Sequence, residues 1–114
     1  MAGHRTGRAA EDITRELTAI LRTVKDPRVS GRMLSVVRAE VAGDLSAAKV
    51  FISAMEGFEV AQEAVRGLES AAGYIRTQLG QALKLRHVPA LKFVADDSIA
   101  YGARIAETLK DLES

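Results

Sequence analysis

The sequence predicts one small α+β domain in which a three-stranded sheet carries helices on one face. Apolar residues recur at helical spacing in several segments, two neighbouring segments alternate between apolar and polar residues, and a short apolar segment follows Pro89. The length of 114 residues is that of a single domain. The chain has no cysteine, which excludes disulfides, thiolate metal sites and a thiol nucleophile.

We expect the first helix at residues 8–24. Its apolar positions follow the spacing of an amphipathic helix: Ile13, Leu17, Ile20, Leu21 and Val24. The helix must end near Lys25, because Asp26 precedes Pro27 and the residue before a proline is disfavoured in the helical conformation.

Two strands are expected at residues 34–41 and 48–54, joined by a turn at residues 43–46 into an antiparallel hairpin. In the first strand one face is predicted to carry Val37, Ala39 and Val41, and the other Arg38 and Glu40. In the second strand Val50 and Ile52 are predicted to alternate with Lys49, Phe51 and Ser53.

A helical pattern covers residues 57–69, and a further one continues to about Leu85. The pattern leaves open whether these are one helix or two, because the small residues between them permit a sharp kink and Ser70 could cap a second helix. We place the kink at Ser70, Ala71, Ala72 and Gly73.

A third strand is expected at residues 91–95, with Leu91, Phe93 and Ala95 facing the core. Asp96-Asp97-Ser98 would then cap a final helix at residues 99–112. The predicted order is α-β-β-α-kink-α-β-α. The domain would span residues 8–112, between a flexible N-terminal segment (1–7) and a short C-terminal end (113–114).

The net charge of +1 hides an uneven distribution. Residues 70–92 contain no acid and four cations, Arg76, Lys84, Arg86 and Lys92. Residues 96–114 contain five acids and two cations, so their net charge is negative. No window approaches the roughly 20 apolar residues of a membrane span, and the N-terminus lacks the apolar stretch of a secretory signal. We therefore expect a cytoplasmic protein.

A helical projection from Arg76 places Gly73, Gly80 and Lys84 within about 80° of it, beside the apolar face. Glycine costs roughly 1 kcal/mol relative to alanine inside a helix, so two glycines on one strip need a reason. A phosphodiester backbone lying close to the helix between the two cations would supply one. The alternative is that the glycines let another element pack closely and that the cations are only solvated.

Several of these segments together resemble the ribosome-binding factor A family. The matching pieces, in order, are Asp26-Pro27-Arg28, Asp44-Leu45 with Ala48, Ala72-Gly73-Tyr74-Ile75-Arg76, the run from Leu85 to Phe93, and Asp96-Asp97-Ser98. The resemblance runs from about Arg5 to Leu112. It implies a type II K-homology-like (KH-like) fold in which a helix–kink–helix replaces the usual Gly-x-x-Gly loop. It also implies binding to 16S ribosomal RNA on free 30S small subunits, assistance in late maturation and 5′ processing of that RNA, and importance for growth in the cold.

The candidate RNA-binding residues are Arg5, Arg8, Lys25, Arg28, Gly73, Arg76, Gly80, Lys84, Arg86 and Lys92. For Arg28 the favoured interpretation is structural, with an Asp26–Arg28 pair that fixes the turn after the first helix. For Arg86-His87, a C-terminal cap of the helix, where cations favour the helix dipole, is as good an interpretation as RNA contact, and the two can coexist. Asp44 is interpreted as a turn residue, and Asp96 with Asp97 as a helix cap.

No enzyme is predicted, because the chain has no phosphate-binding loop, dinucleotide motif, metal-ligand cluster or Ser–His–Asp set. We expect no catalytic residue, metal or cofactor, and a monomer. Only Phe51 and Tyr74 could stack on bases, and Phe51 is expected to pack against a helix, so RNA should be recognised by phosphate charge and shape. The alternatives are a module whose Gly73–Gly80 face receives a partner helix, and a KH-type binder of messenger RNA, which the missing Gly-x-x-Gly loop disfavours.

Overall fold

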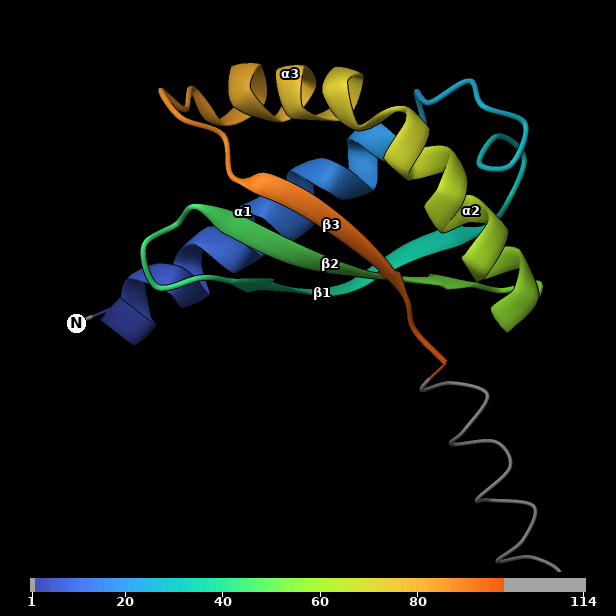
Figure 1. Cartoon of the computed structure of the whole chain (residues 1–114), viewed down its shortest axis with the longest axis horizontal. Coiled ribbons are helices and arrows are strands. Elements are labelled where there is room, and N and C mark those ends of the chain that lie inside the picture. Colours follow the sequence, from blue (N-terminus) through green and yellow to red (C-terminus); the bar gives the residue numbers. More distant parts are fainter. Residues whose placement is uncertain (1, 98–114) are drawn as a thin grey trace, which may run out of the picture.

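The structure, a computed structural model, describes residues 2–97, with side chains from residue 7 onward. Its elements in chain order are α1 (Ala2–Leu21), β1 (Leu34–Val41), β2 (Ala47–Ala54), α2 (Phe58–Ser70), α3 (Ala72–Leu83) and β3 (Ala90–Ala95) (Figure 1). The predicted order is confirmed over these residues. The final helix at residues 99–112 and the Ser98 end of its proposed cap lie outside the described residues. None of the described helices is long and apolar enough to cross a membrane.

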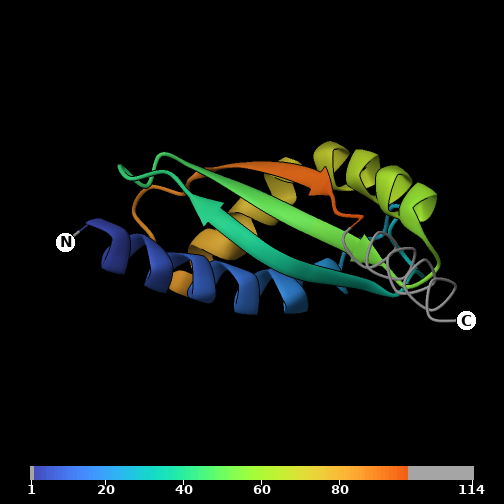
Figure 2. The ribbon, with the colours of Figure 1, turned by 90° about the horizontal axis from the view of Figure 1, so that it is seen from below.

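The strands form one mixed sheet in the order β1-β2-β3. β1 and β2 pair antiparallel, and β2 and β3 pair parallel. Two parallel neighbours require a crossover connection, and α2 with α3 supply it. Viewed from below, the sheet lies in front of α3 (Figure 2). The sheet face turned away from α3 is left uncovered by the described helices.

The register of β1 differs from the alternation that the sequence predicts. Val36 pairs with Ile52 but Arg38 pairs with Phe51, so Val37 is an extra residue in a bulge. Val37 is therefore exposed, and Val36 takes the inward position that the alternation assigned to Val37. The prediction for Val37 was wrong because a bulge shifts every residue before it onto the other face.

The expectation that Phe51 packs against a helix was also wrong. Phe51 lies on the sheet face opposite the helices, where the Arg38 guanidinium carbon sits 3.8 Å from the centre of its ring. The cation thereby shields one side of the aromatic ring on an otherwise polar surface.

The first helix is longer at its start and shorter at its end than predicted. It begins at Ala2, before the predicted start at Arg8, so residues 2–7 continue the helix and do not form a separate N-terminal segment. After Leu21 the backbone tightens, and the amides of Thr23 and Val24 bond to carbonyls three residues earlier. The predicted stop before Pro27 is confirmed.

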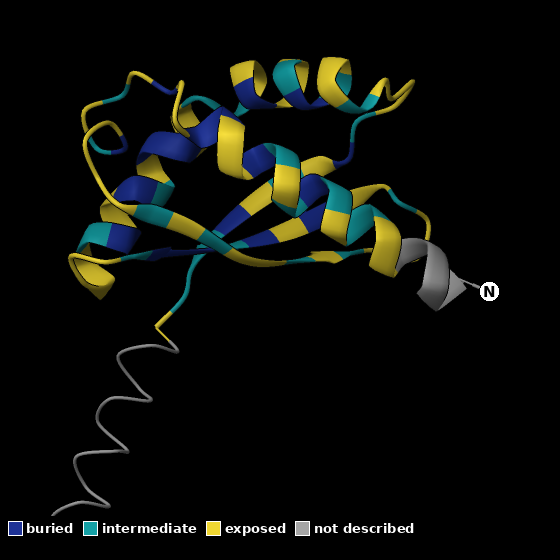
Figure 3. Cartoon of the chain, turned by 180° about the vertical axis from the view of Figure 1, so that it is seen from behind, coloured by how far each residue is buried: buried dark blue, intermediate teal, exposed yellow. Residues whose placement is uncertain are grey.

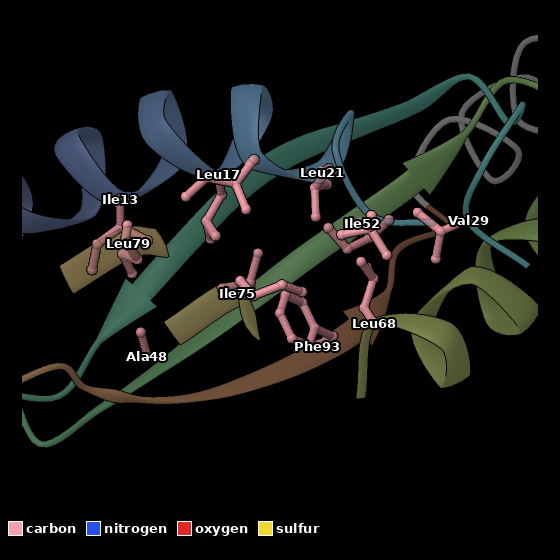
Figure 4. Packing of buried hydrophobic residues seen from close by; sticks show 13 residues of the cluster. Ile13, Leu17, Leu21, Val29, Ala48, Ile52, Leu68, Ile75, Leu79 and Phe93 are labelled. Atoms are coloured by element: carbon pink, nitrogen blue, oxygen red, sulfur yellow. The ribbon is translucent and has the colours of Figure 1, made fainter. Parts of the chain in front are cut away.

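A single apolar core lies between the sheet and the three helices (Figure 3). All five apolar positions predicted for the first helix are buried, as are Val50 and Ile52 of β2 and Phe93 of β3. Figure 4 shows Leu17 of α1, Ile75 and Leu79 of α3 and the strand residues pointing into this common space. The core is thus built from the amphipathic faces that the periodicity identified.

The break between α2 and α3 is present, at Ala71. Ala71 leaves helical geometry (φ −96°, ψ 10°) while its amide bonds to the Gly67 and Leu68 carbonyls and its own carbonyl accepts from Ile75. Ser70 does not cap α3 as suggested, because its hydroxyl donates back to the Arg66 carbonyl at 3.2 Å. Two helices with one non-helical residue between them therefore replace a continuous helix.

Candidate RNA-binding surface

The start of α3 carries the most open part of the predicted strip. Gly73 is exposed, and a Cβ atom built on it would meet no other atom within 4 Å. Arg76 is exposed one turn later, and its Nη2 donates to the Val88 carbonyl at 3.1 Å. This hydrogen bond holds the guanidinium at the surface between α3 and the loop before β3, and its other donors have no partner among the described residues.

Gly80 has a packing explanation. A Cβ atom at this position would lie 2.8 Å from Cγ2 of Val88, so the loop before β3 covers the place where a side chain would be. The alternative interpretation of the two glycines therefore holds for Gly80. A phosphodiester backbone cannot approach this glycine as closely as it can approach Gly73.

Lys84 and Arg86 do not extend the helical strip, because α3 ends at Leu83 and not near Leu85. Lys84 is the C-terminal cap in the left-handed conformation (φ 53°), and the Leu85 amide bonds to the Gly80 carbonyl at 2.9 Å. Both cations are exposed, with His87, in the loop that follows. The predicted row of two glycines and two cations is thus divided between a helix and a loop.

The turn after α1 is held by an ion pair between Asp26 and Arg28. Arg28 donates from Nε to Oδ1 at 2.9 Å, from Nη2 to Oδ2 at 2.8 Å, and from its backbone amide to Oδ1 at 2.9 Å. These hydrogen bonds, the side-chain ones first, lower the pKa of Asp26 to about 2, and the same pair raises the pKa of Arg28. The favoured structural interpretation of Arg28 is confirmed.

This turn is also joined to the helix break by contacts that the sequence did not predict. Nη2 of Arg28 donates to the Ser70 hydroxyl at 3.2 Å, and the hydroxyls of Thr23 and Tyr74 lie 2.6 Å apart. A Cβ on Gly67 would lie 2.8 Å from Val29 Cγ2 and 3.0 Å from Asp26 Oδ1, so α2 and the turn are in direct contact. A glycine inside a helical segment, four residues before the break, was the only local signal for this approach.

The remaining candidates are dispersed. Lys25 is exposed in the turn and Arg8 is exposed on α1, while the side chain of Arg5 is not among those that the structure describes. Lys92 is exposed on β3 next to Lys49 of β2, on the sheet face away from the helices. The fold therefore brings Lys25, Arg28, Gly73 and Arg76 to the region of the helix break, and it does not bring Lys92 or Arg8 there.

The Asp44 carboxylate accepts from both the amide and the hydroxyl of Ser46, which confirms Asp44 as a turn residue and lowers its pKa. Among residues 2–97, no three His, Asp or Glu side chains are grouped so that they could hold a metal ion.

Comparisons with known proteins agree with this architecture. The sequence model of ribosome-binding factor A matches residues 5–109. Ribosome-binding factor A of Heliobacterium modesticaldum is 43% identical, over 100% of this chain and 93% of its own length. A solution structure of a Thermotoga maritima protein described as a ribosome binding factor A has a TM-score of 0.72 and 28% identity, covering 82% of this chain and 89% of its own.

A third similar structure is the Thermus thermophilus ribosome binding factor A homology model fitted into a cryo-electron microscopy map of a 30S complex with that factor. It has a TM-score of 0.60 and 25% identity, over 73% of this chain and 86% of its own. The expected type II KH-like fold, with a helix–kink–helix in place of the Gly-x-x-Gly loop, is confirmed by the element order and by these neighbours.

Proposed function

Because the chain belongs to the ribosome-binding factor A family, we propose that it binds free 30S small subunits through 16S ribosomal RNA and assists late maturation of that RNA. The observation that carries the proposal is the likeness to the Thermus thermophilus factor fitted into the 30S map. The proposed contact surface is the region of the helix break, with Gly73 and Arg76 at its centre and Lys25 and Arg28 at its side.

The protein would act in the cytoplasm as a monomer, and it would bind RNA without catalysing the making or breaking of a covalent bond. A protein that binds one RNA arrangement more tightly than another shifts the population toward it by the difference in binding free energy. Alternative RNA pairings persist longer at low temperature, so this assistance would matter most in the cold. Processing near the 5′ end would follow from the RNA arrangement that the bound protein favours.

The geometry favours an RNA backbone over a partner helix on the Gly73–Gly80 face. A partner helix would need both glycines open along one strip, whereas Val88 already lies over Gly80. Gly73 is open, and Arg76 stands beside it. A phosphate group needs only such a local approach and a nearby cation.

Sucrose-gradient sedimentation of the tagged protein tests the proposal. The protein should comigrate with free 30S subunits and be absent from translating ribosomes; recovery only in the soluble fraction would contradict it. Affinity for 30S subunits should fall with salt at a log–log slope of roughly −3 to −4, the value for about four neutralised phosphates. Arg76→Ala should weaken binding, whereas Arg15→Ala, which removes an exposed α1 cation paired with Asp12, should not.

A further inference from the structure

A cavity of about 550 Å³ opens at the end of α1. It is bounded by the last turn of α1, the chain from Val29 to Ser35, and the end of β2. We infer that this cavity receives one unpaired nucleotide of the RNA bound by the protein. The inference rests on the proposed function and names a second contact for the same partner.

The size and lining of the cavity suit a nucleobase. Its volume lies within the range of about 300–1,000 Å³ that small-molecule sites occupy. Its lining includes the apolar residues Leu21, Val29 and Met33 and the cations Arg22 and Arg32. An apolar wall accepts the flat face of a base, while guanidinium donors can bond to its edge or to its phosphates.

Two methionines at this site are unusually exposed for apolar side chains. Met33 is 67% exposed and Met55 is 81% exposed, and the Met55 amide bonds to the Met33 carbonyl at 3.0 Å. The two side chains thus stand next to each other on the border of the cavity. Methionine is flexible and polarizable, so such a pair can adapt to a flat ring placed against it.

Two cations border the same cavity. Arg22 and Arg32 are both exposed lining residues, and neither guanidinium group has an ion-pair or hydrogen-bond partner in the described part of the chain. None of the lining residues among those that the structure describes is acidic. The neighbouring carboxylate of Glu56 is already engaged, because both of its oxygens accept from the Met33 amide at 3.1–3.2 Å. Two unpaired guanidinium groups beside an apolar cavity match the phosphates on either side of an inserted base.

The end of α1 links the cavity to the surface proposed for RNA. Arg22 is followed by Thr23, whose hydroxyl contacts Tyr74 of α3 next to Gly73. Figure 1 shows the chain after α1 running beside the junction of α2 and α3. A strand of RNA that passes Gly73 and Lys25 can therefore continue to Arg22. An acidic protein segment could satisfy the arginines as well, but it would lack the flat group that the cavity fits.

Methyl NMR tests the inference with three built-in reporters, because the chain has three methionines, Met1, Met33 and Met55. The full chain is labelled with ¹³C-methyl methionine, and its signals are assigned with M33L and M55L. The probes are a short oligoadenylate, an abasic oligomer of the same length, and an oligoglutamate peptide. We expect oligoadenylate to shift the Met33 and Met55 signals and not Met1, and the abasic oligomer to leave all three in place.

The charge contribution is tested with R22Q/R32Q. We expect about ten-fold weaker binding of oligoadenylate, the order of two exposed charge-assisted hydrogen bonds, and a salt slope shallower by about 1.4, the value for two phosphates of a single strand. The matched control K49Q/R66Q removes the same charge from exposed positions outside the cavity and should bind as the wild type does.

Several results would overturn the inference. They are unmoved Met33 and Met55 signals with oligoadenylate, equal shifts with the abasic oligomer, tighter binding of the oligoglutamate peptide, and an R22Q/R32Q affinity equal to that of the wild type. Failure of the proposed function is seen separately, as absence of the wild-type protein from the 30S fraction of the gradient. A protein that sediments with 30S subunits but shows unmoved methyl signals keeps its function and loses this site.

Discussion

The Arg28 guanidinium connects the turn after α1 to the break between α2 and α3, because the group that is paired with Asp26 at 2.8 Å also donates to the Ser70 hydroxyl at 3.2 Å. A planar guanidinium with several donors can hold two partners at once in a fixed geometry. The position of the helix break relative to α1 thus depends on a short turn far from it in sequence.

Replacing Asp26 by Asn should loosen this connection. The amide keeps the size of the carboxylate but loses the ion pair, so we expect a lower free energy of unfolding in urea and faster hydrogen exchange at the Ala71 and Ile75 amides. Asp44→Asn is the matched control, since the Asp44 carboxylate serves only the hairpin turn. Equal exchange at Ala71 in the Asp26→Asn variant and the wild type would disprove the connection.

The same ion pair predicts a pH dependence of stability. The pKa of Asp26 is about 2 in the folded protein against an ordinary value of 3.8, so folding favours the ionised form. Its stabilisation is therefore complete above about pH 5 and is lost as the pH falls from about 4 through 2. Urea unfolding at a series of pH values should show the difference between wild type and Asp26→Asn shrinking over that interval. A difference that stays constant down to pH 2 would contradict the lowered pKa.

Gly67→Ala should destabilise the fold. The new Cβ would lie 2.8 Å from Val29 Cγ2, 3.0 Å from Asp26 Oδ1 and 3.2 Å from Arg28 Cβ, with the turn held in place by its own ion pair. Overpacking of this kind typically costs about 1–3 kcal/mol. The free energy of unfolding from urea titration measures it, and a value equal to or above that of the wild type would show that the turn can move away from α2 at little cost.

Gly73→Ala should have the opposite effect on stability. The position has open space and lies in a helix, so alanine should raise the free energy of unfolding by about 0.5–1 kcal/mol. Binding to 30S subunits should nevertheless weaken, because the methyl group occupies the place proposed for the RNA backbone. A more stable variant with unchanged affinity would remove Gly73 from the contact surface.

Local patterns predicted most of the elements. The spacing of Ile13, Leu17 and Leu21 identified the buried face of α1, and Pro27 identified where the helix must stop. These features depend on residues within a few positions of one another, through helical periodicity and backbone sterics. The family pattern was recognisable for a related reason, since its motifs are short and occur in a fixed order.

The sequence predicted the positions of the candidate functional residues in space less well than it predicted the elements. The bulge at Val37, the cover that Val88 provides for Gly80, and the separation of Lys92 from Arg76 each depend on how segments far apart in sequence pack together. A helical projection treats α3 as if it were isolated and cannot include a loop that lies over it.

The sequence by itself thus determined that this protein is an α+β domain with small residues that permit a kink at residues 70–73 and an acid-free segment over residues 70–92. Only the tertiary structure decided that Gly73 is open while Gly80 is covered, that Arg28 serves the turn and the break together, and that Arg22 and Arg32 share a cavity. The physical reason is that backbone preference and amphipathicity act over one or two turns of chain, whereas exposure and side-chain partners depend on which distant surfaces meet.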